Sequence, residues 1–265
     1  TKQMIETGDF IEIRFQDEAR NKKPIGIYWM QAITAGWMSS EPYNSVWAYR
    51  LPSLIGGILA VLFVFSLGAK LFDEETGLIG AGLMASSLLV IGETHIAKTD
   101  TVLLACITAA QLMVAHFFVA ARQGAPQPAL RDTVLLGLAF GLGILVKGPM
   151  ILFFVGLTVI ALSIWEGRWR WISTMRPMFA LAIVILINVP WLVAIGLVTK
   201  GAYFSEAIGQ DFRGKMGGAQ ESHWGPPGYY LATLLVGFWP GWLFLAPGIV
   251  YALALRSDGA VRFLL

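Results

Sequence analysis

Long apolar runs separated by short polar segments fill most of this 265-residue sequence. Several runs reach roughly 20 residues, the length that a helix needs to cross a bilayer. A helix also satisfies its own backbone hydrogen bonds, which lipid cannot do. We therefore predict an all-α fold, a polytopic transmembrane helical bundle of about seven spans. The predicted spans cover residues 44–71, 76–93, 99–121, 133–147, 149–166, 174–199 and 228–255.

The spans and loops are expected to form a single domain, residues 1–265. Its parts would be a first loop (1–43), six spans (44–199), a long loop (200–227) and a last span (228–255). The apolar run 133–166 is too long for one crossing, and Lys147-Gly148-Pro149 interrupts it, so we predict a tight hairpin there. The sequence begins at Thr1 without a methionine and ends in Arg-Phe-Leu-Leu, like the start of another apolar run. We therefore expect the domain to be truncated at both ends.

The first loop contains one short amphipathic stretch. Pro24 suits the first position of a helix. Four apolar residues then recur four apart on one face: Ile25, Trp29, Ile33 and Trp37. The stretch is too short to span a bilayer, and tryptophan is enriched at membrane interfaces. We predict an interfacial amphipathic helix on the membrane surface; a buried helix in a soluble cap is the alternative.

The composition is typical of a membrane protein. Hydrophobic residues make up 56% of the chain and charged residues 14%, against about 25% charged in an ordinary soluble domain. The net charge of +2 is too small to indicate nucleic-acid binding, so we expect no nucleic acid among the partners. Cys106 is the sole cysteine, which excludes an intrachain disulfide, and we predict that it packs within a span.

Basic residues divide the loops into two sets. One set is short and carries basic residues near the span ends, namely Lys70, Arg122, Arg131, Arg168, Arg170, Arg176, Arg256 and Arg262. The positive-inside rule makes these loops cytoplasmic. The other set would then face outward, and it comprises the loops 1–43 and 200–227 and the turns near 93–98 and 147–149.

Several cations are expected to gather on this outward face. Lys22 and Lys23 precede a predicted helix N-terminus, where unpaired N–H groups already carry partial positive charge. Lysine is unfavourable there unless an anion is bound. Lys147 lies at a helix end, and Arg213 and Lys215 lie in the loop 200–227. Each alone could be a snorkelling or solvated charge, but together they predict a site for an anion such as a phosphate.

Asp100 is the acidic candidate on the same face. It opens a predicted span, so it could be a plain helix cap, yet an ionisable group at the mouth of an apolar helix is also a functional candidate. His95 and His223 are isolated, without metal-ligand spacing, and we interpret them as polar loop residues that could line a cleft. We interpret His116 as a packing residue. The sequence contains no recognisable metal-ligand pattern, and it leaves open whether the activity needs a divalent metal.

Five short motifs occur in a particular order: NKKPIGIYWMQA, YRLPS, AKTDTVLL, GILVKGP, and FRGKMGG with HWGPPGYYL after it. In this order they resemble the polyprenyl-phosphate-sugar glycosyltransferases, which are the family 39 protein mannosyltransferases and the aminoarabinose transferases of lipid A. The resemblance covers almost the whole chain and implies the C-type membrane glycosyltransferase fold. It also implies an enzyme that moves a sugar from a polyprenyl-phosphate carrier to lipid A, a glycan or a protein.

The resemblance further implies roles for individual residues and the side of the membrane on which they act. Lys23, the lysine of the KP motif, would contact the carrier phosphate, with Lys147 and Arg213 in similar roles. Asp100 would be a second acidic residue of the active cleft, because the family's principal catalytic carboxylate is expected upstream of this sequence. Further candidates are Lys22, Lys215 and His223. The expected partners are the lipid-linked sugar donor, membrane lipid and the acceptor, on the extracytoplasmic face of a bacterial inner membrane.

Two other functions stay open from the residues alone. A transporter or flippase for a lipid-linked or anionic solute would place charges along a path through the bilayer. Here the charges are predicted to collect at one face, which favours an enzyme. A membrane scaffold without chemistry would leave the clustered cations unexplained.

Overall fold

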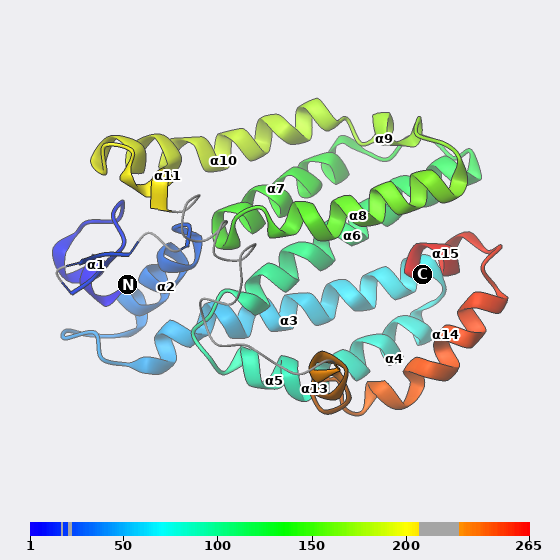
Figure 1. Cartoon of the computed structure of the whole chain (residues 1–265), viewed down its shortest axis with the longest axis horizontal. Coiled ribbons are helices and arrows are strands. Elements are labelled where there is room, and N and C mark those ends of the chain that lie inside the picture. The colour runs from blue at the N-terminus through cyan, green and yellow to red at the C-terminus, as the bar shows by residue number, and fades with distance from the viewer. Residues whose placement is uncertain (17, 21–22, 207–227) are drawn as a thin grey trace.

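The computed structural model describes residues 1–16, 18–20, 23–206 and 228–265 (Figure 1). Within these residues the strands are β1 (Arg14–Phe15) and β2 (Glu18–Ala19), which pair antiparallel in the first loop. The helices are α1 (Lys2–Thr7), α2 (Gly26–Met38), α3 (Val46–Leu71), α4 (Glu74–Ala85), α5 (Leu88–Thr94), α6 (Asp100–Gln123), α7 (Leu130–Lys147), α8 (Met150–Glu166), α9 (Trp171–Thr174), α10 (Pro177–Val198), α11 (Ala202–Glu206), α13 (Tyr229–Gly237), the 3-10 helix η2 (Gly241–Phe244), α14 (Leu245–Ala254) and α15 (Gly259–Leu264). The predicted all-α fold is confirmed.

Helix α6 lies at the centre of the bundle. Of its most apolar stretch 67% is buried, against 17% for α3 and 17% for α10. Val114, Ala115 and Phe117 of α6 are at most 1% exposed and belong to a core shared with α7, α8 and α9. Helix α6 contacts α3, α7, α8, α9 and α15, whereas α10 packs on α7 and α4 packs on α3. Both α3 and α10 present large apolar surfaces outward, as lipid-facing helices do.

The predicted spans all fall on helices. Five of them correspond to the single helices α3, α6, α7, α8 and α10. By length and composition α3, α6 and α10 could each cross a membrane alone, whereas α7 and α8 are shorter, at 18 and 17 residues. The predicted hairpin is confirmed, because α7 ends at Lys147 and α8 begins at Met150, with Gly148 at a φ of 70° in the turn.

Two of the predicted spans are bent and are not continuous helices. The segment 76–93 is divided between α4 and α5, which meet at 63° around Ser86 and Ser87. The segment 228–255 bends by 114° between α13 and the helical stretch that follows Pro240. Sharp kinks arise where proline or paired small residues interrupt the backbone hydrogen-bond ladder. Counting each bent pair as one span, up to five spans qualify within the described residues.

The predicted interfacial helix corresponds to α2, which begins at Gly26, two residues after Pro24. Its exposed side is apolar, since Ile33 is 68% exposed and Trp37 is 88% exposed. Its inward side carries the polar Gln31, which is 7% exposed. An apolar outer face suits a helix in contact with lipid. It does not suit a helix buried in a soluble cap, so the interfacial interpretation is the one that fits.

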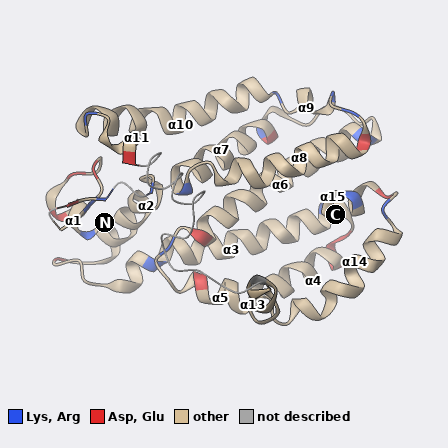
Figure 2. Ribbon diagram, in the orientation of Figure 1, with Lys and Arg blue, Asp and Glu red and all other residues tan. Residues whose placement is uncertain are grey.

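The helices run between two ends, the α2 end and the α15 end. The starts of α3 and α6 and the ends of α7 and α10 lie at the α2 end, and the loops after α3, α6 and α8 lie at the α15 end (Figure 1). Figure 2 shows Lys, Arg, Asp and Glu gathered mainly at these two ends. The short basic loops, which the positive-inside rule puts on one side, all lie at the α15 end.

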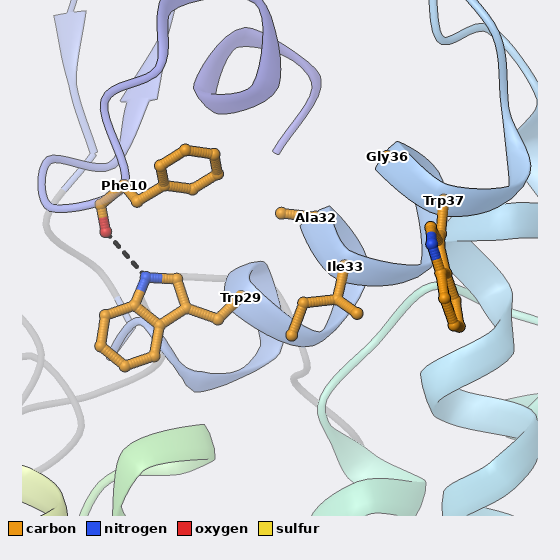
Figure 3. Close-up of a pocket in the computed structure, with 6 residues that line it drawn as sticks. All are labelled: Phe10, Trp29, Ala32, Ile33, Gly36 and Trp37. Carbon is orange, nitrogen blue, oxygen red and sulfur yellow. Dashed lines mark hydrogen bonds between the residues drawn. The ribbon is translucent and has the colours of Figure 1, made fainter.

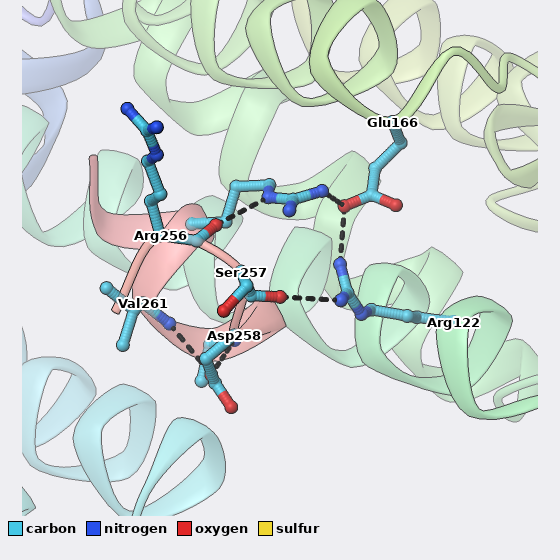
Figure 4. Close-up of polar contacts among 8 residues, drawn as sticks. Arg122, Glu166, Arg256, Ser257, Asp258 and Val261 are labelled. Carbon is cyan, nitrogen blue, oxygen red and sulfur yellow. Dashed lines mark hydrogen bonds and ion pairs between the residues drawn. The ribbon is translucent and has the colours of Figure 1, made fainter. Parts of the chain in front are cut away.

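A carboxylate at the α15 end holds two arginines (Figure 4). Glu166, the last residue of α8, accepts a hydrogen bond from Arg122 of α6 at 2.5 Å and another from Arg262 of α15. Arg122 also donates to the Ser257 carbonyl oxygen at 3.1 Å. The Glu166 side chain is only 17% exposed. These bonds fasten helices that are far apart in the sequence at one point.

Replacing Glu166 with glutamine is expected to lower the melting temperature of the detergent-purified full-length protein. Glutamine keeps the shape of the side chain but loses its charge, and hydrogen bonds to charged groups contribute about 1.5–3 kcal/mol. Since partial exposure screens the pair, we expect a loss of about 1–2 kcal/mol. Glu75→Gln, at an exposed position in the first turn of α4, is the matched control. Equal melting temperatures for the two variants would show that Glu166 does not hold α15.

Candidate active site

Three segments meet at the α2 end: the start of α2, the start of α6 and the end of α7. Ile27, Val102 and Val146, one from each helix, form a small buried cluster. The backbones of α2 and α7 touch, because a Cβ added at Gly26 would lie 2.6 Å from the carbonyl oxygen of Leu145. Only glycine permits such an approach. The cluster therefore holds the start of α6 next to the end of α7, where Asp100 and Lys147 lie.

Asp100 and Lys147 form an ion pair in this region, in which the Lys147 ammonium donates a hydrogen bond to Oδ1 of Asp100. Both side chains stay accessible, at 30% exposure for Lys147 and 41% for Asp100. Each lies at the helix end where its charge is favourable, the acid at an N-terminus and the base at a C-terminus. Because α6 and α7 are antiparallel neighbours, these two ends coincide.

Asp100 is the first residue of α6 and not its cap. The cap position is Thr99, and no side chain caps the helix. Thr99 is buried, and within the described part of the chain its hydroxyl oxygen has no hydrogen-bond partner. The plain-cap interpretation of Asp100 is therefore wrong, and its carboxylate is committed to Lys147 instead.

Lys23 lies three residues before Gly26, on the approach to α2. Its side chain is exposed, and no described carboxylate lies in ion-pair contact with it. Arg50, near the start of α3, is also exposed and lacks such a partner among the described residues. Arg50 lies in the YRLPS motif, but its position gives no separate signal of a site residue. Unpaired cations at this end are available to an anion.

Tyr28 of α2 packs against the same buried residues. Burial raises the pKa of its phenol above the ordinary value, and the charge of Arg20 opposes this shift. The hydroxyl is therefore protonated at neutral pH, where it can donate a hydrogen bond but cannot act as a base.

The other residues that the sequence singled out fall into two groups, those outside the described residues and those that the structure describes. Outside the described residues lie Lys22, Arg213, Lys215 and His223, and their roles stay predictions. His95 is exposed, with Nδ1 2.7 Å from the carbonyl oxygen of Ile91. His116 lies toward the α15 end, where its Nδ1 is 3.8 Å from Oδ1 of Asp132. No three His, Cys, Asp or Glu side chains gather closely enough to hold a metal ion within the residues described.

An apolar groove of about 630 Å³ runs along the exposed side of α2 (Figure 3). Its lining consists of Phe10, Trp29, Ala32, Ile33, Gly36 and Trp37. The indole N–H of Trp29 donates to the carbonyl oxygen of Phe10 at 2.7 Å. This bond joins the segment that precedes α2 to the helix itself. Ile25, predicted on this face, lies just before the helix and is fully buried. The groove begins in the first turn of the helix that follows Lys23.

The profile of the family described as dolichyl-phosphate-mannose-protein mannosyltransferase matches residues 22–193. The chain belongs to this family. The matched residues include Lys23, Asp100 and Lys147, so the cluster at the α2 end lies within the family domain. The predicted membership in a polyprenyl-phosphate-sugar glycosyltransferase family is confirmed.

Several bacterial relatives share one name. The chain is 28% identical over 263 residues to the undecaprenyl phosphate-alpha-4-amino-4-deoxy-L-arabinose arabinosyl transferase of Pectobacterium carotovorum subsp. carotovorum, covering 99% of this chain and 45% of that protein. It is 27% identical over 249 residues to the protein of the same name from Erwinia tasmaniensis, covering 94% and 43%. The chain therefore spans about half the length of the curated relatives it matches.

Two crystal structures share the fold. ArnT from Cupriavidus metallidurans in the apo state superimposes with a TM-score of 0.80 at 16% identity, covering 98% of this chain and 46% of that one. The same protein bound to undecaprenyl phosphate gives a TM-score of 0.77 at 18% identity, with the same coverage. The likeness confirms that the chain is a polytopic helical membrane protein.

Proposed function

We propose that this chain forms part of a membrane glycosyltransferase that moves a sugar from a polyprenyl-phosphate carrier to an envelope acceptor. The observation that carries the proposal is the accessible Asp100–Lys147 pair. The helices of this pair, α6 and α7, meet the helix that follows Lys23 in the buried cluster of Ile27, Val102 and Val146. The names of the relatives favour undecaprenyl phosphate as the carrier and a pentose, aminoarabinose, as the sugar. Lipid A is the acceptor we propose first, with a glycan or a protein as alternatives.

The protein would hold the carrier by its phosphate and by its hydrocarbon chain. Lys23 is exposed and, among the described residues, without a carboxylate partner, so its ammonium is available to the carrier phosphate. The apolar groove along α2 begins in the next helical turn and suits the hydrocarbon chain. Arg213 is a further phosphate ligand in this proposal, on sequence grounds. Lys22, Lys215 and His223 remain candidates on the same grounds.

The Asp100–Lys147 pair would respond to the carrier. While the Lys147 ammonium is bonded to Asp100, Oδ1 of the carboxylate is occupied. A phosphate near Lys23 offers the Lys147 ammonium a competing anion. When the ammonium moves to the phosphate, Oδ1 of Asp100 becomes free to receive a proton. Binding of the donor thereby prepares the base.

Transfer would then follow in one step. Asp100 takes the proton of the acceptor hydroxyl or phosphate as general base. The acceptor oxygen bonds to the anomeric carbon of the sugar while the bond from that carbon to the carrier phosphate breaks. The electron pair stays on the phosphate oxygen, and Lys23 and Lys147 stabilise the charge that develops there.

A flippase for the same lipid is the second candidate. It would place charged side chains along a path through the bilayer. Within the described residues, Asp, Glu, Lys and Arg lie mainly at the two ends of the bundle (Figure 2). This distribution favours chemistry at one face. We place that face on the extracytoplasmic side of the bacterial plasma membrane, because the short basic loops lie at the opposite, α15 end.

Purified full-length protein in sealed vesicles tests the proposal. With undecaprenyl-phosphate-linked, radiolabelled aminoarabinose as donor and lipid A as acceptor, we expect label on lipid A and release of undecaprenyl phosphate. Vesicles without acceptor are the control. Movement of the labelled donor across the bilayer without transfer of sugar would support the flippase and contradict the enzyme. Transfer to a glycan or protein but not to lipid A would correct the acceptor.

A further inference from the structure

The start of α6 is fastened to α3 by an uncharged segment, residues 52–57. Ser53 of this segment is fully buried. Its hydroxyl donates to the carbonyl oxygen of Lys98 at 2.9 Å and accepts from the Lys98 N–H at 3.2 Å, an N–H that also donates to the Ile96 carbonyl oxygen at 2.8 Å. The Thr101 hydroxyl donates to the Ser53 carbonyl oxygen at 2.8 Å. One residue of α3 therefore holds the chain on both sides of Asp100.

Two glycines in the next turn of α3 let this contact form. A Cβ added at Gly56 would lie 2.8 Å from the backbone nitrogen of Val102, and one added at Gly57 would lie 2.2 Å from Cγ2 of Thr94. The Val102 nitrogen is a backbone atom and cannot rotate away as the Thr94 side chain can. The separation of α3 and the first turn of α6 is therefore set by direct backbone contact.

The first turn of α6 needs such support. The leading N–H groups of a helix lack partners within the helix, and a polar side chain at the cap position normally supplies one. No side chain caps α6, and the buried Thr99 hydroxyl oxygen has no partner among the described residues. The bonds to Ser53 do not cap these N–H groups, but they restrain the turn from a neighbouring helix.

We propose that Ser53 is a positioning residue, which fixes residues 94–102 so that the Asp100 carboxylate faces Lys147. Ser53 does not touch the reacting groups, and it acts through the backbone at Lys98 and through Thr101. The structural part of this inference stands on the hydrogen bonds alone, and its catalytic consequence rests on the proposed function. A small neutral serine thereby sets the geometry of the ionisable pair.

Ser53→Ala in the full-length protein tests the inference by two measurements. Hydrogen exchange of the peptide covering residues 94–102 should speed up. The kcat of sugar transfer should fall about ten-fold, as expected for about 1–1.5 kcal/mol of lost hydrogen bonding, while KM for the lipid-linked donor stays within about two-fold, because Lys23 is untouched. Ser66→Ala is the matched control, since Ser66 lies in the same helix and its hydroxyl donates to the Leu62 carbonyl oxygen within that helix, at 2.9 Å.

A second pair of variants keeps the test decisive if Ser53→Ala folds poorly. Thr101→Val removes the hydroxyl at nearly equal volume and should behave like Ser53→Ala, whereas Thr101→Ser keeps the hydroxyl and should behave like the wild type. Unchanged exchange at residues 94–102 in Ser53→Ala and Thr101→Val would overturn the proposal. Faster exchange with unchanged kcat would overturn the positioning role. A wild-type protein without transfer would contradict the proposed function, and the exchange data would still decide whether Ser53 holds the segment.

Discussion

Replacing Asp100 with asparagine in the full-length protein is expected to reduce sugar transfer by about two to four orders of magnitude, the range for loss of a general base. Asparagine has nearly the same size and can still accept a hydrogen bond from Lys147, but it cannot take a proton. The ion pair is partly exposed, and such pairs contribute only about 0.2–1 kcal/mol, so the melting temperature should change little. The measurement is transfer from an undecaprenyl-phosphate-linked sugar, with thermal unfolding recorded on the same samples.

Asp73→Asn is the matched control for this experiment. Asp73 caps α4 at the α15 end, where its carboxylate accepts a hydrogen bond from the Thr76 N–H at 2.7 Å. Asparagine caps a helix nearly as well as aspartate, so both stability and transfer should be preserved. Full activity of Asp100→Asn at normal stability would remove Asp100 from proton transfer. Another carboxylate of the full-length protein would then take that role.

Replacing Lys23 with alanine is expected to reduce transfer about ten- to hundred-fold. A hydrogen bond from a charged donor contributes about 1.5–3 kcal/mol, and each 1.36 kcal/mol corresponds to about ten-fold in rate. Because Lys23 is exposed and has no ion-pair partner among the described residues, its loss removes no such contact from the folded state. The melting temperature should therefore not move. Steady-state kinetics with the lipid-linked donor, at fixed salt concentration, give the result.

Two further variants separate a specific contact from general attraction. Lys23→Arg keeps a cation at the site and should retain more activity than Lys23→Ala. Lys200→Ala removes an exposed lysine from the turn after α10, at the same end of the bundle, and should leave transfer unchanged. Equal losses in Lys23→Ala and Lys200→Ala would mean that overall positive charge attracts the carrier, and the assignment of the phosphate to Lys23 would be wrong.

The positions of the helices could be predicted from the sequence because an apolar run in lipid has to satisfy its own backbone. The run predicted at 149–166 is α8, Met150–Glu166, and the one predicted at 99–121 begins and ends within two residues of α6. The bends within 76–93 and 228–255 could not be predicted in this way. Hydropathy averaged along a segment does not show where the helix axis changes direction. A bend also depends on how the neighbouring helices pack.

Asp100, Lys147 and Lys23 could be found in the sequence because few charged residues interrupt the apolar runs and each of the three lies in one of the five ordered motifs. Ser53 could not, because a small neutral residue within an apolar run gives no signal until its burial and its bonds to Lys98 are seen. Arg50 could not be recognised either, because one exposed cation near a span end is ordinary.

The sequence by itself determined that the chain is a helical membrane protein, and it determined which ionisable groups stand at the helix ends. Only the tertiary structure decided which of those ends meet. Asp100 and Lys147 are 47 residues apart, and they pair because α6 and α7 pack antiparallel, while glycines such as Gly26 let the neighbouring backbones touch. Contacts of this kind depend on residues that are distant along the chain, so no local pattern of apolar and polar positions specifies them.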